Sequence, residues 1–391
     1  MTEAHKTYTM SNGKKTVLIF GIGKLGGPLV DVLSARYPQH QFVLISRNKE
    51  ISQKRATLSQ YLCLQWGLNP VILSDETDLY DVVRTAELIY KYQPDVVLNA
   101  TTPFPWWKID ILPIQEKKLA NEAGPGVWCA LDCVLPLRLT EALSLVGSNA
   151  IHINACYPDM TNAFLSSHKC APRLGIGNIS NLVPGLQLGF ANHLSISPKE
   201  VEIRLVGHHY VSWNAPTLSG CEDAQYDLTV FYPNGKLHFS GPDDAPFAIL
   251  RKYASRIRGL DGLGVTIGSA ATLIASFLGS PQRQHHSPGA NGLPGGYPVH
   301  IDFSGEVKLN LPKELSVKQA IAINEKTQVL DGIDHVEAGK VLSSPKAREA
   351  YSRIIGAELP AVTFDNITEL ALDTLSRLNS RFNLNLNNSH E

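Results

Sequence analysis

The chain has 391 residues, of which 43% are apolar and 18% are charged. This balance is typical of globular proteins, and the length corresponds to two or three domains of about 100–200 residues each. A net charge of -1 from 35 basic and 36 acidic side chains excludes the strong overall positive charge of many nucleic-acid-binding proteins. No apolar run reaches the roughly 18 residues of a membrane-spanning helix, and residues 1–15 lack the apolar stretch of a signal peptide. We therefore predict a cytoplasmic protein with no nucleic-acid or membrane partner.

Short apolar runs alternate with longer helical patterns over the first 155 residues, after a polar tail over residues 1–14 that we predict to be disordered. The expected strands cover residues 16–20, 41–46, 70–73, 95–100 and 150–155, and the expected helices cover 25–37, 54–66, 78–92 and 129–145. This alternation is typical of a doubly wound parallel sheet with helices on both faces. The predicted fold class is therefore α/β, with a Rossmann-type domain over residues 15–160.

The pattern changes after about residue 160. Strands are expected over 200–207, 228–239 and 307–311, helices over 267–278, 316–330 and 367–378, and a Gly- and Pro-rich loop over 287–298. No internal repeat and no low-complexity linker separates the two parts. We predict an α+β substrate and oligomerisation domain over residues 161–391 that packs closely against the first domain.

Residues 21–26 form a G-x-G-x-x-G motif between the first predicted strand and the first predicted helix. The first glycine permits a tight turn, the second lets the backbone approach a pyrophosphate, and the third lets helix and strand pack closely. The helix then offers free N–H groups to the phosphates at its amino terminus. The alternative is an ordinary strand–helix turn. We predict a dinucleotide site formed by Gly21, Gly23, Lys24, Leu25 and Gly26.

The end of the second predicted strand indicates which dinucleotide binds. NAD enzymes usually place an Asp or Glu there for the ribose hydroxyls, but this chain has Ser46 and Arg47. A guanidinium can bind a 2′-phosphate through two charge-assisted hydrogen bonds, so we predict NADP(H) in preference to NAD(H). In the alternative interpretation, Arg47 and Lys49 are solvated loop charges.

Residues 75–78 and 94–100 resemble extended short-chain reductases and saccharopine-dehydrogenase-like proteins. The resemblance implies that Asn99, Ala100 and Thr101, at the end of the fourth predicted strand, lie against the cofactor. The Tyr-x-x-x-Lys pair of short-chain catalysis is not found at a suitable place. This resemblance therefore supports the Rossmann domain and not that mechanism.

The later segments resemble the superfamily that joins lactate and malate dehydrogenases with the NAD-dependent family 4 glycosidases. Similar segments follow one another in the family's order, at residues 153–158, 175–187, 190–198, 205–209 and 305–311. The resemblance covers about residues 15–30 and 95–335. It implies a homo-oligomer, a dimer or tetramer, and it places Asn154 beside the nicotinamide.

The resemblance also implies an acid/base residue. In the dehydrogenases a histidine of a Gly-Glu-His motif exchanges a proton with the substrate, and His209 occupies this place after Gly207, with His208 as the neighbouring alternative. An imidazole can make this exchange near physiological pH. A structural or surface role for the histidine stays open. The aspartate that orients the family's histidine is matched only by the neutral Asn178 or Asn181.

Other family residues are missing. The arginine that clamps a substrate carboxylate has no counterpart, and the cation nearest to the mobile-loop arginine is Lys108, after Trp106 and Trp107. The two tryptophans suggest a larger, partly apolar or aromatic substrate, with a buried hydrophobic lid as the plainer explanation. The metal cysteine of the glycosidases would fall near Gly177, which is no ligand, and the six cysteines are thinly spread. We expect reduced thiols and no metal.

Together these observations predict an NADP(H)-dependent oxidoreductase that acts on a carbonyl/hydroxyl or imine/amine group of a small organic substrate. The expected catalytic residues are His209, Asn181 and Lys108. Two alternatives stay open: an NAD-dependent glycosidase-like enzyme and a non-catalytic dinucleotide-binding protein.

Overall fold

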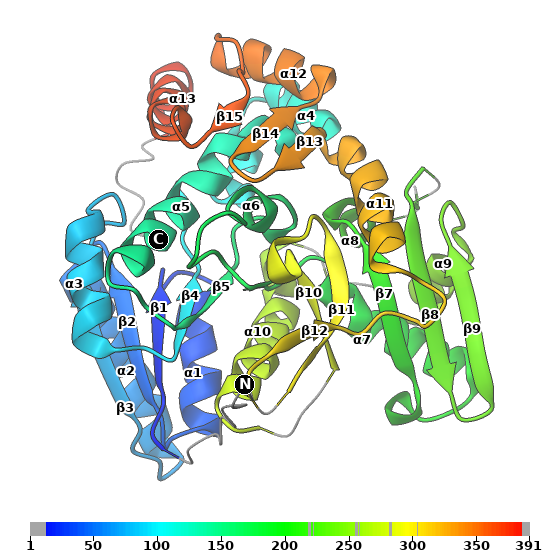
Figure 1. Ribbon diagram of the computed structural model, residues 1–391, viewed down its shortest axis with the longest axis horizontal. Coiled ribbons are helices and arrows are strands. Elements are labelled where there is room, and N and C mark those ends of the chain that lie inside the picture. Colours follow the sequence, from blue (N-terminus) through cyan, green and yellow to red (C-terminus); the bar gives the residue numbers. More distant parts are fainter. Residues whose placement is uncertain are drawn as a thin grey trace, which may run out of the picture.

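The computed structural model describes residues 13–217, 220–221, 223–254, 257, 259–280, 284–302 and 304–384. Most of the tail predicted to be disordered, residues 1–14, lies outside the described residues. Within them the chain builds three sheets, which Figure 1 shows in blue to green, in green to yellow, and in orange.

The first sheet is six-stranded and parallel, in the order β3-β2-β1-β4-β5-β6. Its strands are β1 (Thr16–Phe20), β2 (Gln41–Ser46), β3 (Val71–Glu76), β4 (Val96–Asn99), β5 (Ile151–Asn154) and β6 (Leu174–Gly175). The predicted doubly wound α/β domain is confirmed. Its sixth strand comes from beyond residue 160, where we expected the first domain to end.

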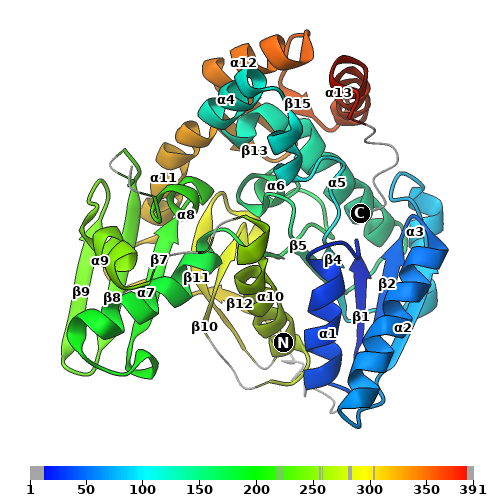
Figure 2. The ribbon, with the colours of Figure 1, turned by 180° about the vertical axis from the view of Figure 1, so that it is seen from behind.

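Continuous apolar runs form the central strands because both faces of the sheet are covered. Alternate residues of β1 face opposite sides: Val17 and Ile19 share a core with α1 (Gly26–Arg36) and α2 (Lys49–Gln65), whereas Leu18 and Phe20 share one with α3 (Val82–Tyr92) and α5 (Cys129–Leu145). Helices α1 and α2 lie in front of the strands in Figure 2. The strand order reverses between β1 and β4, so a cofactor is expected at the carboxyl ends of these two strands.

The second sheet is antiparallel, in the order β10-β11-β7-β8-β9, with β12 paired to β11. Its strands are β7 (Glu202–Gly207), β8 (Tyr226–Tyr232), β9 (Gly235–Ser240), β10 (Gln284–Pro288), β11 (Gly296–Ile301) and β12 (Val307–Leu309). Helix α7 (Ile179–Leu194) packs on it, and α9 (Ala245–Tyr253) packs on α7.

The expectation of a loop over residues 287–298 was wrong at both ends of that segment, which belong to β10 and β11. Gly296 marks close packing and not a turn, because a Cβ there would lie 2.4 Å from the side chain of Ile179 and 2.9 Å from the Gly207 carbonyl oxygen. Only residues 289–295 connect the two strands.

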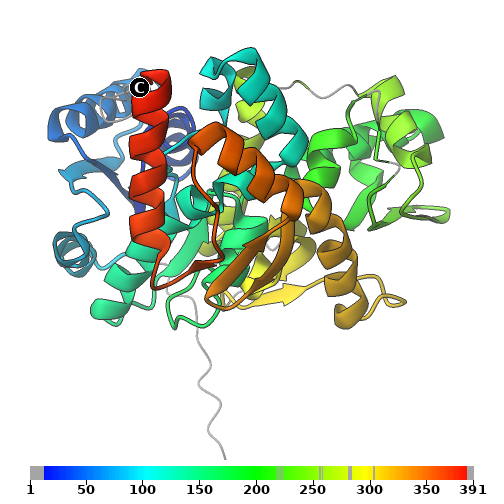
Figure 3. The ribbon, with the colours of Figure 1, turned by 90° about the horizontal axis from the view of Figure 1, so that it is seen from above.

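The third sheet was not predicted. Strands β13 (Ile333–Glu337), β14 (Lys340–Ser343) and β15 (Val362–Thr363) form it, and α11 (Val317–Gln328), α12 (Pro345–Ile355) and α13 (Ile367–Phe382) complete the carboxyl-terminal part. Helix α12 packs on α4 (Ile114–Ala123), and α13 packs on α5. Figure 3 looks down on the orange α12 and the red α13. The end of the chain therefore shares its core with the first domain.

One described segment, Leu260–Phe277, is long and apolar enough to cross a membrane, with a mean hydropathy of 1.4. This differs from the expectation that no run is apolar enough. Most of the segment is α10 (Leu263–Phe277), which packs against α1 and α7. One such helix is weak evidence of a membrane span, because the core helix of a soluble protein can have the same length and apolar composition.

Candidate active site

The loop between β1 and α1 lies at the carboxyl edge of the first sheet. Gly21 has φ 91°, and a Cβ there would lie 2.5 Å from the Ala100 carbonyl oxygen, while a Cβ at Gly26 would lie 2.0 Å from the Gly21 carbonyl oxygen. Gly23 is different, because no atom lies within 4 Å of the place where its Cβ would be. Helix α1 begins without a side-chain cap or an acidic residue in its first turn, which leaves donors for an anion. This loop fits a pyrophosphate.

The turn after β2 holds the residues predicted to select the cofactor. Ser46 Oγ donates to the Asn48 carbonyl oxygen at 2.7 Å, and Asn48 caps α2 by accepting from the Ile51 N–H at 3.1 Å. Arg47 is exposed. The neighbouring acid, Glu76 at the end of β3, accepts from the Lys49 N–H at 3.2 Å. The turn is thus ordered by its own hydrogen bonds, and Arg47 within it is exposed.

Two asparagines form a buried pair at the ends of β4 and β5. Asn99 Nδ2 donates to Asn154 Oδ1 at 3.0 Å, and Asn154 Nδ2 donates to the Cys156 carbonyl oxygen at 3.0 Å. Asn99 Oδ1 also accepts from the Thr101 N–H at 3.2 Å. Both amides are wholly buried. The two amides are thus engaged with each other, whereas Ala100 and Thr101 beside them are partly exposed.

A single carboxylate collects three donors near the end of β5. Asp331 Oδ2 accepts from His208 Nδ1 at 3.0 Å, from His209 Nδ1 at 2.9 Å and from the Tyr157 hydroxyl at 3.1 Å. Burial raises the pKa of Asp331, but the charges and hydrogen bonds of the two histidines outweigh burial and hold the pKa below its ordinary value. Asp331 is therefore an ionised acceptor, and each histidine must carry its proton on Nδ1.

The two histidines differ in exposure. His208 is wholly buried, and its Nε2 has no hydrogen-bond partner among the described residues. The side chain of His209, the first residue of α8 (His209–Asn214), is 18% exposed. Of the pair, His209 is therefore the one that a substrate can reach.

Close backbone packing holds Asp331 in place. Asp331 ends η6 (Val329–Asp331), between α11 and β13, and the turn at Gly124 and Gly126 packs directly against it. A Cβ at Gly124 would lie 2.7 Å from the Asp331 carbonyl carbon, and a Cβ at Gly126 would lie 2.0 Å from the Gly332 carbonyl oxygen. The carboxyl-terminal segment can approach the first domain this closely only because these positions lack side chains.

Aromatic rings surround His209. The Tyr157 ring meets it edge-on with centroids 5.2 Å apart, and the Trp213 ring stacks on it at 6.2 Å. Trp106, the first residue of η1 (Trp106–Ile111), packs against Trp213 at 6.1 Å and against Trp107 at 5.6 Å. Trp106 is 41% exposed and Trp213 is 40% exposed. The two tryptophans thus present apolar surface beside the histidine.

A second carboxylate lies on α5. Asp132 is partly buried in the first turn of that helix, and Cys156 Sγ donates to its Oδ1 at 3.5 Å. Burial raises the pKa of Asp132 to about 7, although the Cys156 thiol and the nearby His209 oppose the shift. Burial also keeps Cys156 a neutral thiol by raising its pKa well above the ordinary value. Neither Asp132 nor Asp331 was identified from the sequence.

Similar proteins were found among solved structures. No family model and no curated protein sequence matches the chain. The lactate dehydrogenase of Cryptosporidium parvum with lactic acid and β-nicotinamide adenine dinucleotide is 15% identical, with a TM-score of 0.52 over 81% of this chain and 98% of that one. The lactate dehydrogenase of Eimeria maxima with NADH and oxamate is 15% identical, with a TM-score of 0.53 over 83% and 94%.

The malate dehydrogenase of Picrophilus torridus is 14% identical, with a TM-score of 0.54 over 82% of this chain and 97% of that one. The chain has the fold of the lactate and malate dehydrogenases. This agrees with the resemblance found in the sequence and with an α/β domain followed by a second domain. Identities this low establish the fold alone.

The other residues predicted to act with the histidine are Asn178, Asn181 and Lys108. Neither expected asparagine supports His209: Asn181 Nδ2 donates to Thr266 Oγ1 of α10 at 2.9 Å, and the Asn178 amide donates to Asp159. The orienting group is Asp331, 122 residues after His209, so local spacing could not have identified it. Lys108 follows Trp107 in η1 and is partly buried.

Two further observations bear on the site. Among the described residues, no group of three or more His, Cys, Asp or Glu side chains is arranged to hold a metal ion.

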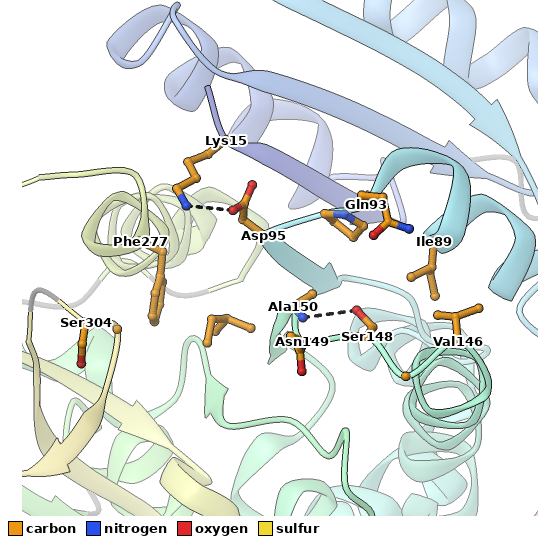
Figure 4. A pocket seen from close by; sticks show the side chains of 14 residues that line it. Lys15, Ile89, Gln93, Asp95, Val146, Ser148, Asn149, Ala150, Phe277 and Ser304 are labelled. Carbon is orange, nitrogen blue, oxygen red and sulfur yellow. Dashed lines mark hydrogen bonds and ion pairs between the residues drawn. The ribbon is translucent and has the colours of Figure 1, made fainter. Parts of the chain in front are cut away.

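A hollow of about 400 Å³, shown in Figure 4, lies at the opposite edge of the sheet, between Lys15, Asp95, Ala150 and Phe277. Here β1, β4 and β5 begin, and the Lys15–Asp95 ion pair of 2.9 Å closes one side. Cofactors of such sheets bind at the carboxyl edge, so this hollow is not part of the candidate site.

Proposed function

We propose that the chain is an NADP(H)-dependent oxidoreductase that acts on a carbonyl/hydroxyl or imine/amine group of a small organic substrate. The observation that supports this most directly is the partly exposed His209, hydrogen-bonded to the buried, ionised Asp331 at the carboxyl edge of a Rossmann-type sheet. The fold adds support, because the similar structures from Cryptosporidium and Eimeria hold nicotinamide cofactors.

In this proposal the β1–α1 loop holds the cofactor pyrophosphate. Gly21 and Gly26 shape the loop, Gly23 leaves room for the phosphates, and the uncapped start of α1 supplies N–H donors. Bound nicotinamide supplies or accepts the hydride. Arg47 binds the 2′-phosphate, and the exposure of its guanidinium beside the hydrogen-bonded Ser46 turn suits that role.

His209 moves the proton. Its Nδ1–H is fixed by Asp331, so Nε2 is the atom that gives a proton to a carbonyl oxygen or imine nitrogen, or takes one in the reverse direction. The carboxylate stabilises the imidazolium form and holds the ring in one tautomer. His208 donates to the same oxygen from a buried position and helps to hold Asp331. In this proposal Asp331 takes the place of the orienting aspartate that the family's pattern lacks at Asn178 and Asn181.

We also propose that the protein is a homo-oligomer. Helix α2 exposes Leu58, Tyr61 and Leu64, with 54%, 62% and 51% of their surface accessible. Exposed apolar side chains gathered on one helix are typical of an association surface. Multi-angle light scattering of the purified protein tests this: we expect a mass of twice or four times the chain, and a monomer would contradict it.

The decisive experiment measures cofactor binding and turnover on one preparation. NADPH binding is followed by fluorescence, and turnover by nicotinamide absorbance with a panel of carbonyl and imine substrates. We expect His209→Gln to bind NADPH within about twofold of the wild type and to lose about 10²–10⁴-fold in turnover. His335→Gln is the matched control, because that histidine is exposed and pairs with the equally exposed Glu337. Full activity in His209→Gln would remove the proposed acid/base.

A further inference from the structure

Tyr157, between β5 and α6 (Pro158–Phe164), has an unusual backbone conformation. Its φ is 37° and its ψ is 60°, in the left-handed region, where a Cβ lies too close to the following carbonyl oxygen. The other described non-glycine residues with a positive φ are asparagine, glutamine or serine, so Tyr157 is the only aromatic residue among them. A strained residue persists only where its surroundings hold it, and such residues cluster at functional sites.

Hydrogen bonds fix the chain on both sides of Tyr157. The side chain of Asn154 binds both backbone groups of Cys156: its Nδ2 donates to the Cys156 carbonyl oxygen and its Oδ1 accepts from the Cys156 N–H, each at 3.0 Å. On the other side, the Tyr157 carbonyl oxygen accepts from the Thr161 N–H at 3.1 Å. Pro158 also disfavours the right-handed helical conformation in the residue before it. The wholly buried Asn154 and the start of α6 therefore set the backbone from which the tyrosine ring projects.

The Tyr157 side chain contacts the carboxylate and both histidines. Its hydroxyl donates to Asp331 Oδ2 at 3.1 Å. Its ring stands at 83° to the rings of His209 and His208, with centroids 5.2 Å and 6.3 Å away. Burial and the nearby carboxylates of Asp331 and Asp159 raise the pKa of Tyr157 well above its ordinary value, so the hydroxyl keeps its proton and acts as a donor. One side chain thus supports the carboxylate and limits rotation of the imidazole that the carboxylate orients.

The hydroxyl also changes how strongly Asp331 attracts a proton on His209. Hydrogen-bond donors spread the negative charge of a carboxylate and stabilise its ionised form. Asp331, which accepts from Tyr157 and from the histidines through one oxygen, therefore stabilises an imidazolium less than it would without the hydroxyl. An acid/base that must both give and take a proton benefits from this balance, because neither of its forms is held too tightly.

We infer that Tyr157 is a positioning residue for the proposed reaction: its hydroxyl shares Asp331 with the histidines, and its ring holds the imidazole of His209 in one orientation. This inference rests on the proposed function, because it concerns the same acid/base. The left-handed backbone conformation is retained because it brings this side chain to Asp331 and His209.

Other titratable groups act on His209 and have to be separated from Tyr157. Asp331 of η6 and His208 belong to the same hydrogen-bonded group, and Asp132 of α5 interacts with His209 through its charge. Burial raises the pKa of Asp132 to about 7, so this carboxyl titrates in the pH range of an imidazole. Each measurement is therefore repeated in an Asp132→Asn background.

Tyr157→Phe removes the hydroxyl and keeps the ring. NMR of the full-length protein, labelled with ¹³C at histidine Cε1, follows the titration of each imidazole, and His209→Gln identifies the His209 signal among the 13 histidines. Without the hydroxyl the carboxylate attracts the imidazolium more strongly. We therefore expect the midpoint of the His209 titration to rise by about half a unit to one pH unit, both with Asp132 present and in Asp132→Asn.

The same variant should change turnover more than binding. In the oxidation direction, which needs neutral His209, we expect kcat below the midpoint to fall about threefold to tenfold, with KM and NADPH affinity within about twofold of the wild type. The substrate is the member of the carbonyl and imine panel, or its reduced form, that the wild type turns over.

Tyr351→Phe is the matched control. It also removes a buried tyrosine hydroxyl, which bonds to Thr374 at 2.6 Å between α12 and α13. It should lower stability in urea about as much as Tyr157→Phe and leave the His209 midpoint unchanged. Circular dichroism verifies that each variant is folded.

Each outcome decides for or against the inference. An unchanged midpoint in folded Tyr157→Phe, the same shift in Tyr351→Phe, or a shift that disappears in the Asp132→Asn background overturns it. The proposed function fails separately. A shifted midpoint in a protein that binds no nicotinamide cofactor refutes the oxidoreductase and keeps Tyr157 as the residue that positions His209, whereas turnover with an unshifted midpoint does the reverse.

Discussion

Replacing Asp331 by Asn removes one charge from the centre of the candidate site with almost no change of shape. The carboxylate accepts from His208, His209 and Tyr157 through one oxygen. An amide oxygen can keep some of these bonds, but the amide nitrogen repels an Nδ1–H and favours the other histidine tautomer. In that tautomer Nε2 carries a proton at rest and can no longer act as a base.

The magnitude follows from the bonds that are lost. Hydrogen bonds to a charged group contribute about 1.5–3 kcal/mol each, so weakening two of them should lower the free energy of unfolding by about 3 kcal/mol. A histidine held in the wrong tautomer costs about 10⁴-fold in turnover in the Ser-His-Asp enzymes; we expect about 10²–10⁴-fold here, with NADPH affinity unchanged.

The assay is steady-state turnover as a function of pH, together with urea unfolding of the same samples. Losing the carboxylate removes the partner of the imidazolium, so the acidic limb of the pH profile should move to lower pH in Asp331→Asn. Asp334→Asn, an exposed acid three residues later, should change neither measurement. If Asp331→Asn loses stability but keeps both its turnover and its pH profile, the Asp331–His209 pair is structural and our reasoning is refuted.

Three other predictions test separate parts of the molecule. Gly23→Val should abolish NADPH binding with little loss of stability, because its Cβ enters open space, whereas Gly26→Val should destabilise the fold by steric overlap with the Gly21 carbonyl; normal NADPH binding by Gly23→Val would show that the loop holds no phosphate. Arg47→Ala should weaken NADPH binding by about 1–3 kcal/mol and leave NADH unchanged, and equal losses for both cofactors would contradict the predicted preference. Burial raises the pKa of Asp132 to about 7 from 3.8, so the folded state binds a proton that the unfolded chain has released, and stability should fall as the pH rises from about 4 to about 7, by at most about 4 kcal/mol. Asp132→Asn should flatten that dependence in thermal melts, and an unchanged slope would mean that Asp132 is not buried as described.

Features carried by adjacent residues were readable from the sequence. The apolar run of β1, the glycine loop and the start of α1 depend on contacts between neighbours, so spacing alone placed them at the right residues. The parallel sheet followed from the alternation of strand and helix, because each short apolar strand must be covered on both faces.

Features that depend on contacts between residues far apart in the chain could not be predicted from the sequence. The segment 287–298 has the composition of a loop, yet its ends are strands because the glycine at 296 lets β11 approach Ile179 and β7. The third sheet gave no usable pattern, since its strands have only two to five residues and gain stability by packing on a core built 200 residues earlier.

The residues of the candidate site likewise fall into those that the sequence predicted and those that only the structure showed. The sequence by itself placed the glycine loop between β1 and α1 and pointed to a histidine after β7, because both are local motifs. Only the tertiary structure showed which carboxylate bonds to His209. Asp331 reaches His209 because turns at Gly124 and Gly126 let the carboxyl-terminal segment pack against the first domain. A carboxylate has no preferred sequence distance from the histidine that it orients, and the low dielectric that strengthens their bond exists only when the chain has folded around both.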